Sequence, residues 1–189
     1  MERNQAGRSW IAKALLFSVS ASFAGMLSGA ALGAAGILLP FEVRVAVASL
    51  LALVALAIGS LELLGRKVPL PQFDRETPQR WLHKGALTWA LLNGSFLGVG
   101  VTSRIGFWLW YVVPLGAFLF ADPALGAAIY GAYSVARGAA VWAIILGLNI
   151  GLLGDDWQER FIARFPAAQT IAACQLVLVG LVGTITIGL

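Results

Sequence analysis

The chain has 189 residues, of which 59% are hydrophobic and 12% are charged, and its mean hydropathy is +0.84. Soluble globular domains carry about 25% charged residues, so this composition excludes an ordinary soluble domain. The formal net charge is +4, but the basic residues flank apolar runs instead of forming a stripe, which argues against a nucleic-acid partner. We expect one polytopic membrane domain over residues 1–189, with the lipid bilayer as its main partner.

The first apolar run covers residues 14–39 and follows a basic N-terminal segment. It is much longer than the roughly 7 to 15 residues of a secretory signal core, so we interpret it as a retained transmembrane helix. Pro40 closes a short connection, and a second helix is expected over 45–64. Both runs exceed the roughly 18 apolar residues that indicate a spanning helix.

Small residues recur at intervals of four in the first helix, at Gly25, Gly29 and Gly33. This spacing leaves one helix face without side-chain bulk, so another helix can approach closely. Gly94 and Gly98 have the same spacing in a later helix. We interpret both patterns as intramolecular packing, with contact to a membrane-protein partner or a homo-oligomer through Gly25, Gly29 and Gly33 as the alternative.

A polar segment over 65–85 separates the second helix from the rest of the chain. Its three prolines exclude a continuous helix. It contains His83, the only histidine, whereas Cys174, the only cysteine, falls in the last apolar run and is expected to be buried there. One histidine and one cysteine far apart in sequence predict neither a metal site nor a dithiol pair.

Residues 85–121 form an apolar run of 37 residues in which Arg104 is the only charged side chain. One straight helix of that length would reach about 55 Å, nearly twice the roughly 30 Å hydrocarbon core. The run therefore either turns back at Thr102–Arg104, between helices 86–101 and 105–121, or crosses once as a broken helix whose aromatic part follows the membrane surface. Both arrangements place Arg104 near an interface, beside an aromatic belt.

Asp122 and Pro123 are typical of a helix N-cap and first helical residue, and they predict a helix over 123–149. A polar segment over 154–169 and a final span to Leu189 follow.

With a turn at Thr102–Arg104 the protein has six transmembrane helices, which form two three-helix inverted repeats, 14–101 and 105–189. With a broken helix it has five spans. All ten basic residues of the N-terminal segment and of the polar segments 65–85 and 154–169 then lie on one side of the membrane, as the positive-inside rule prefers. We favour the six-span arrangement, in a bacterial-type plasma membrane with a cytoplasmic N-terminus.

The most informative residue is Arg137, midway along the expected helix 123–149. An arginine at such a position costs about 2.5 to 3.5 kcal/mol on insertion scales, so it faces a partner or water, or snorkels to the surface. One interpretation is structural, an ion pair with Glu62 near the end of the second helix. The other is functional, an anion-binding group in a central cavity with Arg104 as a second cation. Tyr130, Tyr133 and Ser134 precede Arg137 by seven, four and three residues and share a similar helix face.

The segment over 93–138 resembles the membrane proteins of cytochrome c biogenesis and thiol-disulfide relay, the CcdA and DsbD membrane-domain group. The resemblance implies a broken long helix followed by a helix rich in small residues. It does not imply the relay chemistry, because Ser103 and Arg104 stand where that group carries a Pro-Cys pair. No cysteine lies near Ser28 and Gly29, the corresponding place in the first helix.

The sequence contains no phosphate-binding loop, nucleophile elbow or pair of intramembrane carboxylates, so we expect neither an enzyme nor a cofactor. Two functions remain. The first is a small transporter or permease for an anionic or carboxylate-bearing solute, with Arg137, Tyr133, Tyr130, Ser134 and Arg104 at its site. The second is a noncatalytic membrane subunit that docks in a larger complex or binds its lipid or pigment.

Overall fold

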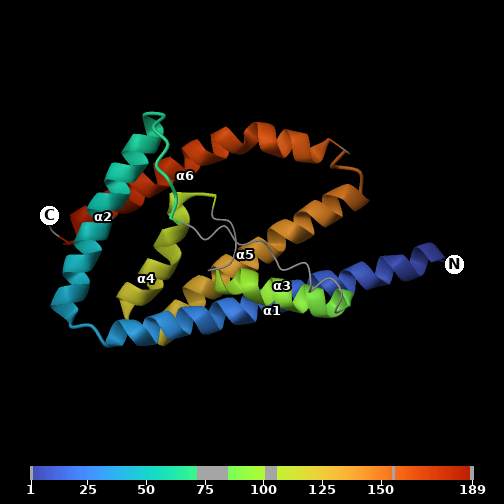
Figure 1. The fold of residues 1–189 in the computed structure, drawn as a ribbon, viewed down its shortest axis with the longest axis horizontal. Helices are drawn as coiled ribbons and strands as arrows, with labels where there is room; N and C mark the ends of the chain where they lie inside the picture. The colour runs from blue at the N-terminus through green and yellow to red at the C-terminus, as the bar shows by residue number, and fades with distance from the viewer. Residues whose placement is uncertain (1, 72–84, 101–105, 155, 188–189) are drawn as a thin grey trace.

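The computed structural model describes residues 2–71, 85–100, 106–154 and 156–187, and helices joined by short connections make up these residues (Figure 1). In chain order the elements are α1 (Glu2–Ile37), α2 (Phe41–Leu63), α3 (Ala86–Val99), the 3₁₀ helix η2 (Trp108–Tyr111), α4 (Val112–Phe120), α5 (Pro123–Asn149) and α6 (Trp157–Ile187). The predicted all-α fold is confirmed.

Four helices are long and apolar enough to cross a membrane: Trp10–Ile37 within α1, and all of α2, α5 and α6. They contain 28, 23, 27 and 31 residues, and about 20 residues suffice for a span. The helices Ala86–Val99 and Trp108–Phe120 are apolar but shorter. The predicted class, a polytopic helical membrane protein, is confirmed.

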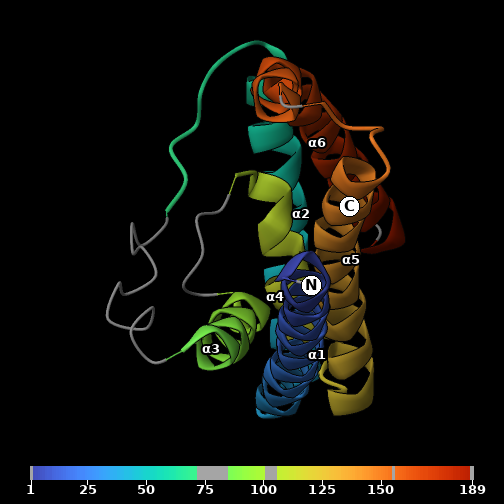
Figure 2. The same ribbon diagram turned by 90° about the vertical axis from the view of Figure 1, so that its right-hand side faces the viewer.

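Helix α1 lies between α3 and α5 and contacts both (Figure 2). The contact with α5 is made at the glycines that the sequence spaces by four. A Cβ atom on Gly29 would lie 2.6 Å from the carbonyl carbon of Gly126, and one on Gly33 would lie 2.7 Å from that of Asp122. Gly25 is likewise covered by Ser134.

These contacts decide between the two interpretations of the glycine face. Gly25, Gly29 and Gly33 are all buried by α5 of the same chain. The structure shows intramolecular packing at this face, where α5 occupies the space beside the three glycines, and it gives no support to an oligomer or membrane-protein partner there. Gly94 and Gly98 of α3 pack in the same way on α1, against Phe17 and Ala21.

The second packed pair consists of α2 and α6. A Cβ atom on Gly59 would lie 3.0 Å from the carbonyl oxygen of Ala173, and one on Gly180 would lie 2.8 Å from that of Ala52. Helix α4 packs against α1 and α5, and η2 contacts α6. Phe107, just before η2, stacks on Phe165 of α6 with ring centroids 5.3 Å apart. Helix α4 therefore contacts the group formed by α1, α3 and α5, and η2 contacts the pair formed by α2 and α6.

The order of the contacts gives the direction of each helix. Gly33 meets Asp122 and Gly25 meets Ser134, so α5 is antiparallel to α1. Gly94 meets Phe17 and Gly98 meets Ala21, so α3 runs parallel to α1 along its first half.

Helix α4 is steeply inclined to α3 (Figure 1) but advances along α1 in the same sense, because the end of α4 reaches the end of α1, where Gly36 meets Phe118. The contacts of α6 with α2 run in opposite order along the two helices, so this pair is antiparallel.

The chain therefore passes through the fold five times: α1, α2 in return, α3 followed by α4, α5 in return, and α6 (Figure 1). This order is that of the broken-helix alternative, but the aromatic part of the run, η2, packs against α6 and α4 instead of forming the separate surface arm that this alternative predicted. The six-span arrangement would need α3 and α4 to be antiparallel, and an inverted repeat would need the two halves of the chain to run in opposite senses. Both halves run in the same sense, so the structure does not show the inverted repeat. The turn at Thr102–Arg104 lies outside the described residues.

This order predicts which loops share a membrane side. Single cysteines in a Cys174→Ser background are introduced as Lys67→Cys after α2, Gln158→Cys at the start of α6, and Leu38→Cys in the turn between α1 and α2. We expect a membrane-impermeant maleimide to label Lys67→Cys and Gln158→Cys from one side and Leu38→Cys from the other. Labelling of Lys67→Cys and Gln158→Cys from opposite sides would restore the inverted repeat.

Helix boundaries match the sequence most closely at α5. The Asp122 carboxylate accepts hydrogen bonds from the backbone N–H groups of Ala124 and Leu125, at 2.8 and 3.1 Å, and the helix covers the predicted 123–149. The polar segment 154–169 differs from the prediction, because most of it forms the first turns of α6, which continues through Pro166. Pro166 removes one backbone hydrogen-bond donor, and the 31-residue helix continues across this position.

Cys174 is exposed, so the prediction of a buried thiol is wrong. The face of α6 that packs on α2 contains Ala173, Leu176 and Gly180, which are buried. At about 3.6 residues per turn, residue 174 lies to the side of that face.

Candidate functional site

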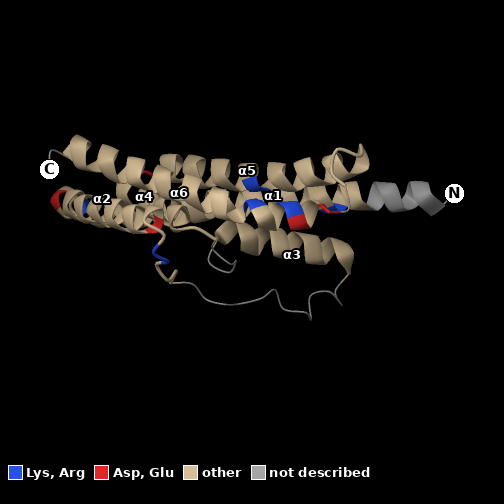
Figure 3. Cartoon of the chain, turned by 90° about the horizontal axis from the view of Figure 1, so that it is seen from above, with Lys and Arg blue, Asp and Glu red and all other residues tan. Residues whose placement is uncertain are grey.

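Charged side chains are sparse along the helices (Figure 3). Helix α5 contains a single charged residue, Arg137. Arg137 lies midway between the ends of α5, and its side chain is partly buried. A guanidinium is always protonated in proteins, so its partners determine what this part of α5 can bind.

Among the described residues, the hydrogen-bond partner of Arg137 is Tyr133, one helical turn earlier on α5. Arg137 Nη1 donates a hydrogen bond to the Tyr133 hydroxyl at 3.1 Å. The guanidinium carbon also lies 5.5 Å from the centroid of the Tyr133 ring, within the range of a cation–π contact. The predicted clustering of these two residues on one face of α5 is therefore present.

Tyr130 supports Tyr133 from the preceding turn. The two rings meet edge to face with centroids 6.5 Å apart, and Tyr130 is only 2% exposed. Its hydroxyl reaches the end of α3, where a Cβ atom on Gly100 would lie 3.5 Å away. Gly100 has a φ of 77°, a left-handed conformation that ends α3 at this point.

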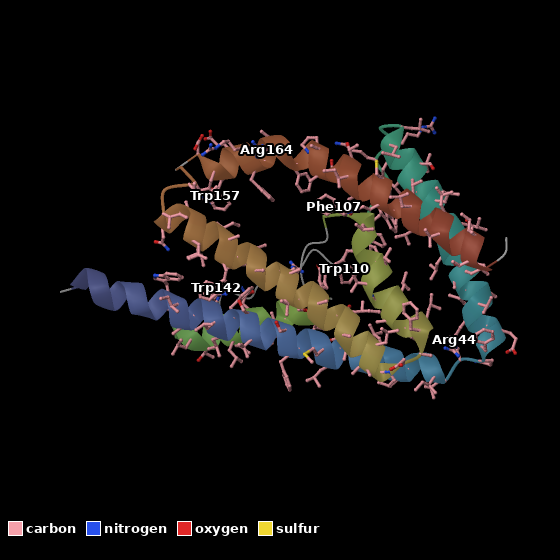
Figure 4. The ribbon with its side chains drawn as sticks, turned by 180° about the vertical axis from the view of Figure 1, so that it is seen from behind. Arg44, Phe107, Trp110, Trp142, Trp157 and Arg164 are labelled. Atoms are coloured by element: carbon pink, nitrogen blue, oxygen red, sulfur yellow. The ribbon has the colours of Figure 1, made fainter. Side chains whose placement is uncertain are left out.

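Trp110 of η2 completes the group. It adjoins Tyr133, and it packs on Gly100, where a Cβ atom would lie 2.7 Å from the indole ring. Figure 4 shows Trp110 between the start of α4 and α5. The Trp110 Nε1–H group is buried and faces the Tyr133 hydroxyl, in a contact outside regular hydrogen-bond geometry.

Arg137, Tyr133 and Trp110, the donor cluster, are rich in hydrogen-bond donors and poor in acceptors. The guanidinium has five N–H groups, of which the described contacts use one. The Tyr133 hydroxyl accepts from Arg137 and faces the Trp110 N–H, so its own proton is free to donate. A carboxylate or phosphate oxygen matches such donors, because charge-assisted hydrogen bonds are the strongest that proteins form.

Ser134 does not belong to the donor cluster. It is 1% exposed, and its side chain lies against Gly25 in the contact between α1 and α5. Its hydroxyl has no hydrogen-bond partner among the described residues. The structure thus brings Tyr130, Tyr133 and Arg137 together, as predicted, but places Ser134 in a closed helix interface.

Glu62 is not brought to Arg137. It lies in the last turn of α2, and α2 packs on α6 instead of α5. Within the described residues no ion pair joins Glu62 to Arg137; the ion pair found there is Arg160 with Asp156, at 2.7 Å. Arg104, the second predicted cation, lies outside the described residues.

Sequence reasoning placed Trp110 in an aromatic belt and missed its contact with Tyr133. The available signal was Gly100, since a glycine after an apolar run is typical of a helix C-terminus. A helix that ends there lets the following residues turn toward α5. The sequence gives no indication, however, of which aromatic side chain would make the contact.

Comparison of the chain with protein-family models, curated proteins and solved structures gave no match. The resemblance to the CcdA and DsbD group therefore stays a prediction from the quoted segment. Of the positions that would carry relay cysteines, Ser103 and Arg104 lie outside the described residues. Ser28 is described, and its hydroxyl donates to the carbonyl oxygen of Ala24 at 2.8 Å.

Proposed function

We propose that this protein is a small multi-pass membrane transporter for an anionic or carboxylate-bearing solute, and that Arg137, Tyr133 and Trp110 bind the anionic group. One observation carries the proposal. A partly buried guanidinium midway along α5 has a tyrosine hydroxyl as its partner, without a carboxylate from the described residues. Neutralisation of that charge is left to a ligand.

The break between α3 and α4 supports the same proposal. Helix α3 ends at Gly100, beside Tyr130 and Trp110, and the next described helix begins at Trp108. Transporters commonly build their substrate sites where a helix is interrupted, because the freed backbone groups then line the site. The donor cluster lies at this interruption.

The proposal includes a bacterial-type plasma membrane with the N-terminus in the cytoplasm. The helix directions bring the start of α1, the end of α2 and the start of α6 to one side. Lys13, Arg66, Lys67, Arg160 and Arg164 belong to these ends. Basic residues in short loops concentrate on the cytoplasmic side.

The second candidate is a noncatalytic membrane subunit. It is favoured by a shallow apolar groove of about 480 Å³ between α1 and α5, lined by Phe23, Met26, Val135 and Trp142 among others. Lipid tails cover such a surface as well as a protein partner does, so the groove does not require a partner. The donor cluster, in contrast, holds a guanidinium whose described partner is a neutral hydroxyl, and an anion would complement that charge.

A ligand screen tests the transporter proposal. The purified protein is heated with acetate, lactate, succinate, benzoate or inorganic phosphate, and each carboxylate is paired with its neutral amide. We expect at least one anion, and not its amide, to raise the melting midpoint. A ligand at about one hundred times its Kd stabilises the folded state by about 2.7 kcal/mol. Equal effects of acid and amide, or no effect across the series, would count against an anion site.

A further inference from the structure

A second site is formed between α2, α4 and α6, on the other side of α4 from α1. It is a cavity of about 360 Å³, lined by apolar side chains from all three helices, among them Leu51, Ile58, Leu115, Leu176 and Val179. Ligand pockets commonly measure about 300 to 1,000 Å³. Arg137, Tyr133 and Trp110 do not line it, so it is separate from the donor cluster.

The cavity follows α4 from one end to the other. Trp108 and Tyr111 line it at the start of α4, and Leu119 and Phe120 line it at the end. Gly116 lies between them, and a Cβ atom there would meet no atom within 4 Å. The space beside Gly116 is therefore open, and it suits a flexible apolar chain that lies along α4.

The two ends of the cavity differ in their polar groups. At the start of α4 the chain satisfies its own donors: Trp108 Nε1 donates to the carbonyl oxygen of Val68 at 3.2 Å, and the Tyr111 hydroxyl donates to that of Pro71. No spare donor of these two side chains remains there for a ligand headgroup.

Arg44 lies next to the opposite end: it is one turn before the lining residue Ala48, although it does not itself line the cavity. Arg44 Nη1 donates to the carbonyl oxygens of Leu119 and Phe120, both at 3.4 Å. Its Nε–H group is buried and has no hydrogen-bond partner among the described residues. Figure 4 shows Arg44 at the corner where α2 begins and α4 ends.

This corner lies at one end of the bundle, where the turns between α1 and α2 and between α4 and α5 meet. In a membrane, helix ends of this kind reach the level of the lipid headgroups. Glu42 and Asp122 are the acidic residues nearest in sequence to Arg44 and to the end of α4. Both are exposed, and Asp122 is engaged in capping α5.

We propose that this cavity holds an acyl chain of a bilayer phospholipid, with the headgroup phosphate on Arg44. The apolar lining accepts the chain and fills the open space beside Gly116, which restores packing contacts that an empty cavity lacks. The guanidinium supplies the complementary charge at the headgroup end, and arginine binds phosphate oxygens with high geometric specificity. This site is independent of the transporter proposal.

Native mass spectrometry of the full-length protein tests the lipid site. The protein is delipidated in detergent and titrated with dioleoyl phosphatidylglycerol. We expect one lipid to bind more tightly than the rest. Arg44→Gln should weaken that lipid about tenfold, since it removes a charge-assisted contact. Gly116→Leu should weaken it at least as much, because the leucine side chain occupies the cavity.

Two matched variants serve as controls. Gly116→Ala removes the same glycine but adds only a methyl group, and Arg160→Gln removes an exposed arginine that is paired with Asp156. Both should keep the tight lipid. Retention of that lipid in Arg44→Gln or in Gly116→Leu would overturn the proposal, as would its equal loss in the Arg160→Gln control. Melting midpoints of all four variants establish that each is folded.

Discussion

Gly29→Leu is expected to disrupt the contact between α1 and α5 and to prevent the protein from reaching its native fold. A Cβ atom at Gly29 would overlap the carbonyl oxygen of Gly126 and lie 2.6 Å from its carbonyl carbon. These are backbone atoms, so no side-chain rotation relieves the overlap and the two helices must separate. Overpacking a core costs about 1 to 3 kcal/mol, and more where the backbone has to move.

The matched control is Gly116→Leu, the same substitution on α4, where the added side chain enters open space. The two variants are compared by size-exclusion chromatography and by melting midpoint in one detergent. We expect Gly29→Leu to aggregate or to melt far below wild type, and Gly116→Leu to elute and melt like wild type. Equal behaviour of the two would show that α1 and α5 are not in backbone contact.

Arg137→Gln is expected to abolish binding of the anion while the protein stays folded. The substitution removes the charge, and the loss of one partner of a desolvated charge pair costs about 2 to 5 kcal/mol of binding free energy. Stability should fall by only about 1 kcal/mol, because the hydrogen bond lost is one to the neutral Tyr133 hydroxyl. The melting midpoint is measured with and without the anion that stabilises wild type.

An ion pair between Arg137 and Glu62 would give a different pattern of melting midpoints. If Arg137 were locked to Glu62, either single substitution would strand a buried charge and cost about 3 to 5 kcal/mol. Glu62→Gln is therefore the matched control, and we expect it to leave both the midpoint and anion binding unchanged. A large destabilisation by Glu62→Gln, with rescue in the double variant Arg137→Leu with Glu62→Leu, would contradict the site described here.

Local features of the fold could be predicted from the sequence because neighbouring residues determine them. Asp122 and Pro123 predict the start of α5, since the cap needs only the next two or three backbone N–H groups. The spacing of Gly25, Gly29 and Gly33 predicts close helix packing for a similar reason. The pairing of Tyr133 with Arg137 follows from the spacing of four residues on a helix.

Long-range features could not be predicted, because hydropathy records the length of a helix and not its direction or its neighbour. The run over 85–121 is too long for one straight helix, which is compatible with both arrangements, and only the contacts of Gly94 and Gly98 with α1 give the direction of α3. The contact of Trp110 with Tyr133 depends on the interruption between α3 and η2, which hydropathy does not locate. Ser134 was assigned to the site from helical spacing alone, whereas α1 covers its side of α5.

The most direct test of the proposed site is solute uptake by proteoliposomes. Wild-type protein and Arg137→Gln are reconstituted at equal density, together with Arg160→Gln as a control that loses an exposed arginine outside the donor cluster. The solute is the radiolabelled carboxylate that raises the wild-type melting midpoint most. The proposal predicts saturable uptake by wild type and by Arg160→Gln, and uptake at the level of empty liposomes by Arg137→Gln. Saturable uptake that is equal in Arg137→Gln and wild type would contradict it.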